Sequence, residues 1–210
     1  MKEPVNTWTH LIGFVAGIVG LVFLLLRSTD DLSKFVIMSI FGVSILLLYG
    51  ASSLYHGVKT TKEKELLLRK LDHIAIFLLI AGTYTPVLYY GLDGGWQLAM
   101  LIAVWTVTVL GILMKVFFMN LPRWLSTAVY LALGWVAVIP FGRLVGGLPP
   151  GALVLIVAGG LSYTIGGIVY GTKKISLFSN KLGFHEIFHL FILLGTLLHF
   201  LMVFFYITPL

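Results

Sequence analysis

The sequence predicts an all-α membrane protein: a seven-transmembrane helix bundle that forms a single domain over residues 1–210. Of its residues, 59% are hydrophobic and only 10% are charged, whereas a soluble protein has about 25% charged residues. The mean hydropathy is +1.04. The apolar runs are continuous and do not alternate every second residue, which disfavours β-strands. In lipid, helices satisfy their own backbone hydrogen bonds.

Seven apolar runs are each close to the roughly 20 residues that a helix needs to cross a bilayer. They cover residues 8–26, 35–56, 72–90, 96–118, 124–145, 151–171 and 184–207. The first run is too long for a signal-peptide core, and a second run follows it at once. We therefore expect it to remain in the protein as the first span.

Turn-forming residues separate the spans. Polar residues 28–31 end the first span, glycines within 91–95 end the third, and Gly-Pro residues within 146–150 precede the sixth. Residues 60–68, between the second and third spans, are compatible with either a short amphipathic surface helix or a solvated loop. Tryptophans near the starts of the first, fourth and fifth spans are typical of membrane interfaces. These are Trp8, Trp96 and Trp124.

Basic residues gather on one predicted face of the membrane. Eleven lie on the N-terminal face: Lys2, Lys59, Lys62, Lys64, Arg69, Lys70, Lys115, Arg123, Lys173, Lys174 and Lys181. The opposite face has three: Arg27, Lys34 and Arg143. By the positive-inside rule, the N-terminus is expected in the cytoplasm and the C-terminus outside, in the cell inner (plasma) membrane. The net charge of +6 therefore indicates topology and no nucleic-acid surface, and membrane lipids are the expected partners.

Three histidines are candidate ligands for one metal ion. His185 and His189 are four residues apart at the start of the seventh span, and His56 ends the second. Residues four apart share a helix face, so the pair can close on one ion while His56 completes the set from a facing helix. There are no cysteines, which leaves histidine and carboxylate as ligands. The pattern predicts zinc with a fourth position open for water, as in catalytic zinc sites.

Two polar residues are predicted at the same depth as these histidines. Asp72 opens the third span, and Ser52 lies one helical turn before His56. Asp72 is expected to orient a zinc-bound water and accept its proton, and Ser52 is expected to bond that water or Asp72. Both are therefore candidate catalytic residues.

Other roles for the histidines remain open at this point. His56 could be an interfacial polar residue while the pair at 185 and 189 packs helices through hydrogen bonds. The string His185-Glu186-x-x-His189 also matches a metalloprotease motif, with Glu186 as base and Asp72 as third ligand, but that leaves His56 unexplained. We expect Glu186 to act near the helix start, where its negative charge suits the helix dipole.

Three more histidines are not expected to be ligands. His10 is predicted to form hydrogen bonds at a helix interface. His73 follows Asp72 on a helix and points about 100° away from it, toward a neighbour or the lipid head groups. His199 lies about 15 Å along the axis from His189 and is expected to make a buried polar contact.

The motifs together resemble those of the hemolysin III proteins, the bacterial branch of the progestin and adipoQ receptor family. They are Asn6-Thr7-Trp8-Thr9-His10-Leu11, Ser52-x-x-x-His56, Asp72 and His185-x-x-x-His189, in order along nearly the whole chain. The resemblance implies seven helices, a cytoplasmic N-terminus and zinc held by those three histidines, with Ser52 and Asp72 near its water. The family's receptors have a long cytoplasmic N-terminal domain that this sequence lacks, so hormone reception is not expected. At the position of Glu186, the resemblance implies a glutamine in the receptors.

The resemblance extends to alkaline ceramidases and thereby implies hydrolysis of a lipid amide. The expected function is a zinc-dependent hydrolase of an amide or ester bond in a membrane lipid. Two alternatives remain open. One is a non-enzymatic membrane protein with structural zinc that acts in membrane homeostasis or signalling. The other is a cytolytic protein, although a compact bundle is a poor candidate for a secreted pore.

Overall fold

The computed structural model describes residues 1–173 and 182–210, and no strand occurs among them. The helices are α1 (Pro4–Leu26), α2 (Leu32–Gly57), α3 (Lys62–Gly91), α4 (Gly94–Phe117), α5 (Arg123–Gly134), α6 (Phe141–Gly147), α7 (Pro150–Thr172) and α8 (Phe184–Met202). Lys174 and Lys181, which entered the charge comparison, lie outside the described residues.

Six of these helices are long and apolar enough to cross a membrane, and α5 with α6 gives a seventh span if that bent pair is one crossing. The pair is bent by 53°. A 3-10 segment, Val136–Val138, precedes the bend, and Pro140 lies at the start of α6. Proline has no N–H to donate to the preceding turn, so a continuous helix is broken there. The chain is thus an all-helical, multi-pass membrane protein.

The third helix begins earlier than its apolar pattern suggests. Residues 62–71 form its first turns, so the segment left open between a surface helix and a loop is continuous with the span. The Thr61 side chain caps this end by accepting a hydrogen bond from the Lys64 N–H at 3.5 Å. Glu63 and Glu65 lie in the first turn, where negative charge suits the helix dipole.

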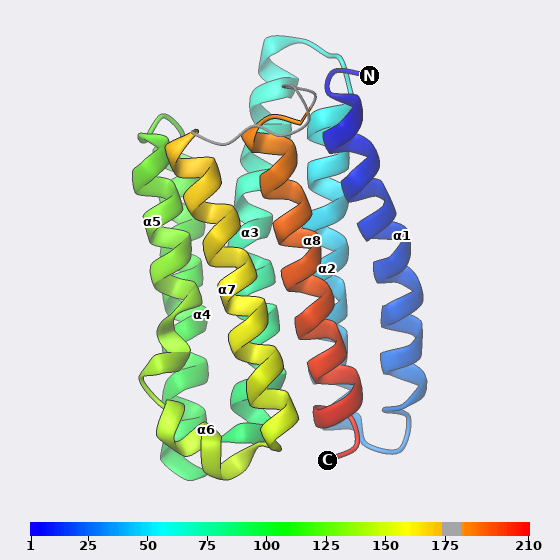
Figure 1. The fold of residues 1–210 in the computed structure, drawn as a ribbon, viewed down its shortest axis with the longest axis vertical. Coiled ribbons are helices and arrows are strands. Elements are labelled where there is room, and N and C mark those ends of the chain that lie inside the picture. The colour runs from blue at the N-terminus through cyan, green and yellow to red at the C-terminus, as the bar shows by residue number, and fades with distance from the viewer. Residues whose placement is uncertain (174–181) are drawn as a thin grey trace.

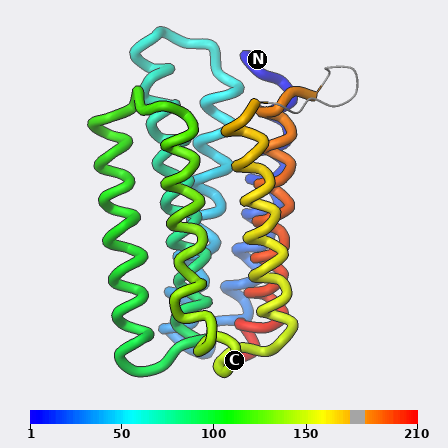
Figure 2. Tube along the Cα trace, turned by 60° about the vertical axis from the view of Figure 1, so that its left-hand side comes forward, coloured from blue at the N-terminus to red at the C-terminus, as the bar shows by residue number. Residues whose placement is uncertain are grey.

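The helices form a closed bundle (Figures 1 and 2). Neighbours in the chain pack together from α1 to α4, α5 packs on α7, α7 packs on α8, and α8 closes the ring against α1. Helix α3 contacts α2, α4, α5 and α6 and has the most buried membrane-spanning window. The two termini lie at opposite ends of the bundle (Figure 1), as an odd number of crossings requires.

Large apolar side chains cover the outside of the bundle and polar side chains lie within it. On α1, Ile12, Val15 and Val19 are exposed, whereas Asn6 and His10 are buried. A water-soluble protein rarely exposes continuous apolar surface of this extent. Lipid is the solvent that suits this surface, and ionisable groups buried inside such a bundle commonly mark a functional site.

Close packing of α6 on the end of α3 depends on a glycine. A Cβ added at Gly147 would overlap the carbonyl oxygen of Gly91, whereas one added at Gly146 would meet open space. We expect Gly147→Ala to lower the free energy of unfolding by about 1–3 kcal/mol through overpacking. Thermal melting of the purified protein measures this, with Gly146→Ala as the matched control. Equal melting temperatures for the two variants would contradict the packing argument.

Candidate metal centre

Three histidine rings from two helices meet at the N-terminal end of the bundle. One ring nitrogen from each of His56, His185 and His189 lies within 4.8 Å of the others. His56 and His189 are buried, and His185 is partly exposed. His56 comes from the last turn of α2, and the other two come from the first turns of α8. The structure therefore brings together the predicted ligand set.

The local sequence explains this meeting. The i, i+4 spacing puts the two α8 rings on one helix face, with centroids 4.8 Å apart. The chain before α1 binds the end of α2, because the Glu3 N–H donates to the carbonyl oxygen of His56 at 2.9 Å. Helix α1 in turn packs against both α2 and α8. The N-terminal segment thus fixes the end of α2 beside the start of α8.

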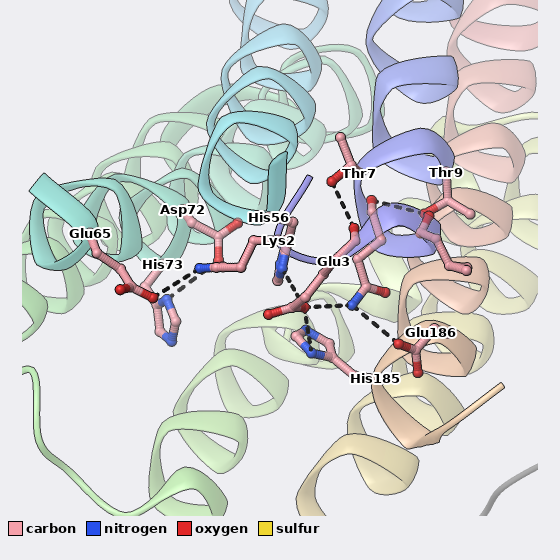
Figure 3. Close-up of polar contacts among 12 residues, drawn as sticks. Lys2, Glu3, Thr7, Thr9, His56, Glu65, Asp72, His73, His185 and Glu186 are labelled. Carbon is pink, nitrogen blue, oxygen red and sulfur yellow. Dashed lines mark hydrogen bonds and ion pairs between the residues drawn. The ribbon is translucent and has the colours of Figure 1, made fainter. Parts of the chain in front are cut away.

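A carboxylate that the sequence argument missed lies beside this cluster. Glu3 Oε2 is 2.8 Å from His56 Nδ1 and 3.8 Å from His185 Nδ1 (Figure 3). Asn6 Nδ2 donates to the same oxygen at 2.8 Å. The sequence does show an acidic residue three positions before Asn6, at the start of the first span, which could have indicated a polar contact there. It does not show the contacts of Glu3 with His56 and His185, because both are distant in sequence.

Glu3 fixes which nitrogen of His56 is free. Glu3 lies before α1; burial favours a higher pKa for its carboxyl, but the Asn6 hydrogen bond and the charges of His56 and His185 outweigh this and lower it. An ionised carboxylate only accepts hydrogen bonds, so His56 Nδ1 carries the proton and donates. The Nε2 lone pair of His56 is then available to a metal ion.

His10 also belongs to this region, but not as the predicted hydrogen-bonding residue. Its ring stacks on His189, with centroids 3.7 Å apart and planes at 14°. Both ring nitrogens of His10 are buried without a hydrogen-bond partner among the described residues. The stacked ring limits how the plane of His189 can rotate. His10 is not in the three-histidine cluster.

A cavity of about 320 Å3 opens beside the cluster. It is lined by His185 and His189 and by both predicted catalytic residues, Asp72 and Ser52. Ser52 is buried, and no hydrogen bond joins it to Asp72 among the described residues. The pairing of these two residues therefore stays a prediction, while both line one cavity together with His185 and His189.

His73 is outside the three-histidine cluster, as expected, but it lies beside Asp72. Its ring lines the cavity, with Nδ1 3.5 Å from Asp72 Oδ2 (Figure 3), and the Nδ1–H donates to the carbonyl oxygen of Arg69 at 2.9 Å. Helix α3 is surrounded by other helices, so side chains about 100° apart both face the interior. The His73 ring thus lies beside the Asp72 carboxylate, while its Nδ1–H is bonded to the backbone of its own helix.

Two further polar residues of α8, Glu186 and His199, lie outside the three-histidine cluster. The Glu186 side chain accepts from Asn6 Nδ2 at 3.4 Å, and Glu186 is not among the residues that line the cavity. This position does not suit the base of a metalloprotease. His199 is buried; its Nδ1–H donates to the carbonyl oxygen of Gly195 at 2.8 Å and its ring stacks on Tyr163, as a buried polar contact requires.

The donor set fits a metal ion. Buried imidazoles normally have hydrogen-bond partners, yet His189 Nδ1 has none among the described residues. Three rings crowd together, and no carboxylate belongs to the group that could hold the ion. Coordination would relieve the cost of placing these ring nitrogens together away from water, because each lone pair would gain a partner.

Comparison with known proteins covers nearly the whole chain. It matches the family described as haemolysin-III related over residues 1–200. It is 40% identical over 207 residues to the "Hemolysin-3 homolog" of Bacillus subtilis (strain 168), covering 98% of this chain and 94% of that protein. It is 37% identical over 212 residues to "Hemolysin-3" of Bacillus cereus, covering 99% and 93%.

A more distant relative is a receptor. The "Adiponectin receptor protein" of Drosophila melanogaster is 26% identical over 221 residues, which cover 94% of this chain and 49% of that protein. The sequence motifs, the helical bundle and these matches agree along the length of the chain. The chain belongs to the haemolysin-III related family.

Proposed function

We propose that this membrane protein binds zinc through His56, His185 and His189 and hydrolyses an amide or ester bond of a membrane lipid. Imidazole nitrogen is a preferred zinc ligand, and three protein ligands leave a fourth position open. The nitrogens of the cluster, within 4.8 Å of one another, support this assignment. When bound, zinc would lower the pKa of water to about 7 and polarise a carbonyl group.

The single observation that carries the hydrolase proposal is the shared cavity. Asp72 lines the same cavity as two of the candidate ligands, His185 and His189. Asp72 would accept a proton from the attacking water, and the His73 ring, whose Nδ1 is 3.5 Å from Asp72 Oδ2, would be its polar neighbour. Ser52 would bond the same water. The aliphatic part of the cavity wall suits an acyl chain.

The proposed site faces the cytoplasm. The charge asymmetry of the sequence supports a cytoplasmic position for the N-terminal end of the bundle, and the histidines lie at that end, in the last turn of α2 and the first turns of α8. The inner (plasma) membrane would then provide the substrate from its cytoplasmic leaflet. This is consistent with membrane lipids as the partners of the protein.

Two other functions are distinguishable from hydrolysis. Structural zinc would stabilise the bundle for homeostasis or signalling without turnover, and cytolysis is suggested by the names of the two Bacillus relatives. Lipid profiling of cells with and without the protein tests the proposal. Loss of the protein should raise one class of intact lipid and lower its cleaved product. An unchanged lipid profile would contradict hydrolysis.

The contacts of Glu3 with His56 and His185 predict that it contributes to metal affinity. We expect Glu3→Gln to weaken zinc binding by about 10–100-fold, because it removes the carboxylate that orients His56 and lies near His185. Competition against a zinc indicator measures the affinity. Glu65→Gln is the matched control, since Glu65 pairs with Lys2 at 3.0 Å and forms no ion pair with a histidine among the described residues. Equal affinities for the two variants would exclude a positioning role for Glu3.

A further inference from the structure

Three basic side chains line the cavity without acidic partners. They are Arg69 on α3, Lys115 on α4 and Arg123 on α5, and Asp72 is the acidic residue that lines the same cavity. The chain has eight acidic residues, all within the described ranges. Among the ion pairs of the described residues, none involves these three cations. The cavity therefore has an excess of positive charge.

Lys115 is the most deeply placed of the three. The residue is 1% exposed, and its Nζ donates to Ser126 Oγ at 2.6 Å. The ammonium also lies 5.8 Å from the centroid of the Tyr130 ring. An ammonium group has three donors, and a hydroxyl oxygen and an aromatic face do not balance its charge. A buried charge is costly unless it is paired with an opposite charge.

Arg123 connects this basic region to the histidine cluster. Its guanidinium lies over the ring of Tyr170 at 4.7 Å and over that of Phe184 at 5.1 Å. Arg123 Nη1 is buried without a hydrogen-bond partner among the described residues. The Tyr170 ring is in turn 5.4 Å from the His185 ring. The unpartnered guanidinium nitrogen thus lies one aromatic ring away from the candidate metal ligands.

Much of the remaining cavity wall is aliphatic, although Thr83, Thr127 and Thr164 also line it. Its wall includes Ile76, Leu79, Ile80, Val87, Ile156 and Ile192 from α3, α7 and α8. A space with cations at the N-terminal end and aliphatic side chains beyond them matches a molecule that has an anionic group and a hydrocarbon chain. A soluble anion would use the cations and leave the apolar wall without a partner.

We propose that Lys115, Arg123 and Arg69 bind the anionic head group, a phosphate or carboxylate, of a lipid whose chain lies along the apolar wall. The occupant would be the substrate of the proposed hydrolase, and to that extent the inference rests on the proposed function. Binding does not require turnover or metal. It can therefore be measured in metal-free protein, where a failure of hydrolysis has no effect on the result.

The test uses the purified full chain in an uncharged detergent after treatment with a chelator. Three probes are compared by a binding titration: dodecyl phosphate, the uncharged monolauroylglycerol of the same chain length, and inorganic phosphate. We expect dodecyl phosphate to bind at least tenfold more tightly than either of the others. Equal affinity for monolauroylglycerol would overturn the anionic site, and equal affinity for inorganic phosphate would overturn the lipid assignment.

Variants then assign the binding to these side chains. Hydrogen bonds between charged groups are strong, so Lys115→Gln and Arg123→Gln should each weaken dodecyl phosphate binding by about 10–100-fold. Monolauroylglycerol binding should stay unchanged, which also shows that the variants fold. Arg123→Lys should retain more affinity than Arg123→Gln. Lys59→Gln, an exposed cation at the same end of the bundle, is the control for charge. The same loss with Lys59→Gln would overturn the assignment.

Discussion

Replacing Asp72 with asparagine is expected to lower lipid hydrolysis by about 10²–10⁴-fold, the range for loss of a general base, with the metal content unchanged. Asparagine has nearly the same shape as aspartate but cannot accept a proton from water. Asp72 lines the cavity beside His185 and His189 without belonging to the three-histidine group. The variant therefore separates the proton acceptor from the metal ligands.

The measurement combines two readouts on the same preparation. Release of fatty acid from a panel of N-acyl and ester lipids gives turnover, and elemental analysis gives zinc per chain. Glu63→Gln is the matched control, because it removes an exposed carboxylate from the same helix outside the cavity. If Asp72→Asn keeps full turnover, Asp72 is not the base. If it loses zinc, the residue acts on the metal site.

Replacing His185 with alanine is expected to reduce bound zinc from about one ion per chain to nearly none. The two remaining histidines come from different helices, and the paired grip of residues four apart on α8 is lost. Zinc that binds only the folded protein stabilises it, by about 4 kcal/mol at a thousandfold excess over its dissociation constant. The variant should therefore melt at a lower temperature than the zinc-loaded wild type.

A chelator provides the internal check on this prediction. It should lower the melting temperature of the wild type and leave that of His185→Ala unchanged. His199→Ala is the matched control, since it removes another buried imidazole from α8 that bonds the Gly195 carbonyl. That variant should keep its zinc and its response to the chelator. Zinc retained by His185→Ala at the wild-type level would exclude His185 as a ligand.

The sequence predicted the spans well because lipid requires long apolar helices. It did not predict the early start of α3, and Pro140 alone did not distinguish a kink from a break. Residues 62–71 combine six charged residues with four leucines, so they lack the continuous apolar run of a span, although Thr61 and the acidic first turn are helix-start signals. A proline near the end of a span can kink a helix or interrupt it, and packing against neighbouring helices decides which.

The three ligand candidates could be predicted because they depend on helix periodicity and depth, both of which the sequence encodes. Glu3 could not, since its contacts with His56 and His185 join segments distant in sequence. The position of His73 on the cavity wall could not be predicted either, because one helix angle does not show how many sides of α3 are buried. The sequence analysis counted Arg69, Lys115 and Arg123 only as charges of the N-terminal face. The positive-inside rule counts charges without regard to burial, so it does not show that these side chains line a cavity.

X-ray absorption at the zinc edge tests the central claim most directly, because it reports the atoms bound to the metal. The purified wild-type protein should give three imidazole nitrogens at about 2.0–2.1 Å and one further light ligand. Single replacement of His56 or His189 should abolish this signal, as for His185. A wild-type protein that binds no zinc when supplied with it, or a spectrum without imidazole ligands, would contradict the account.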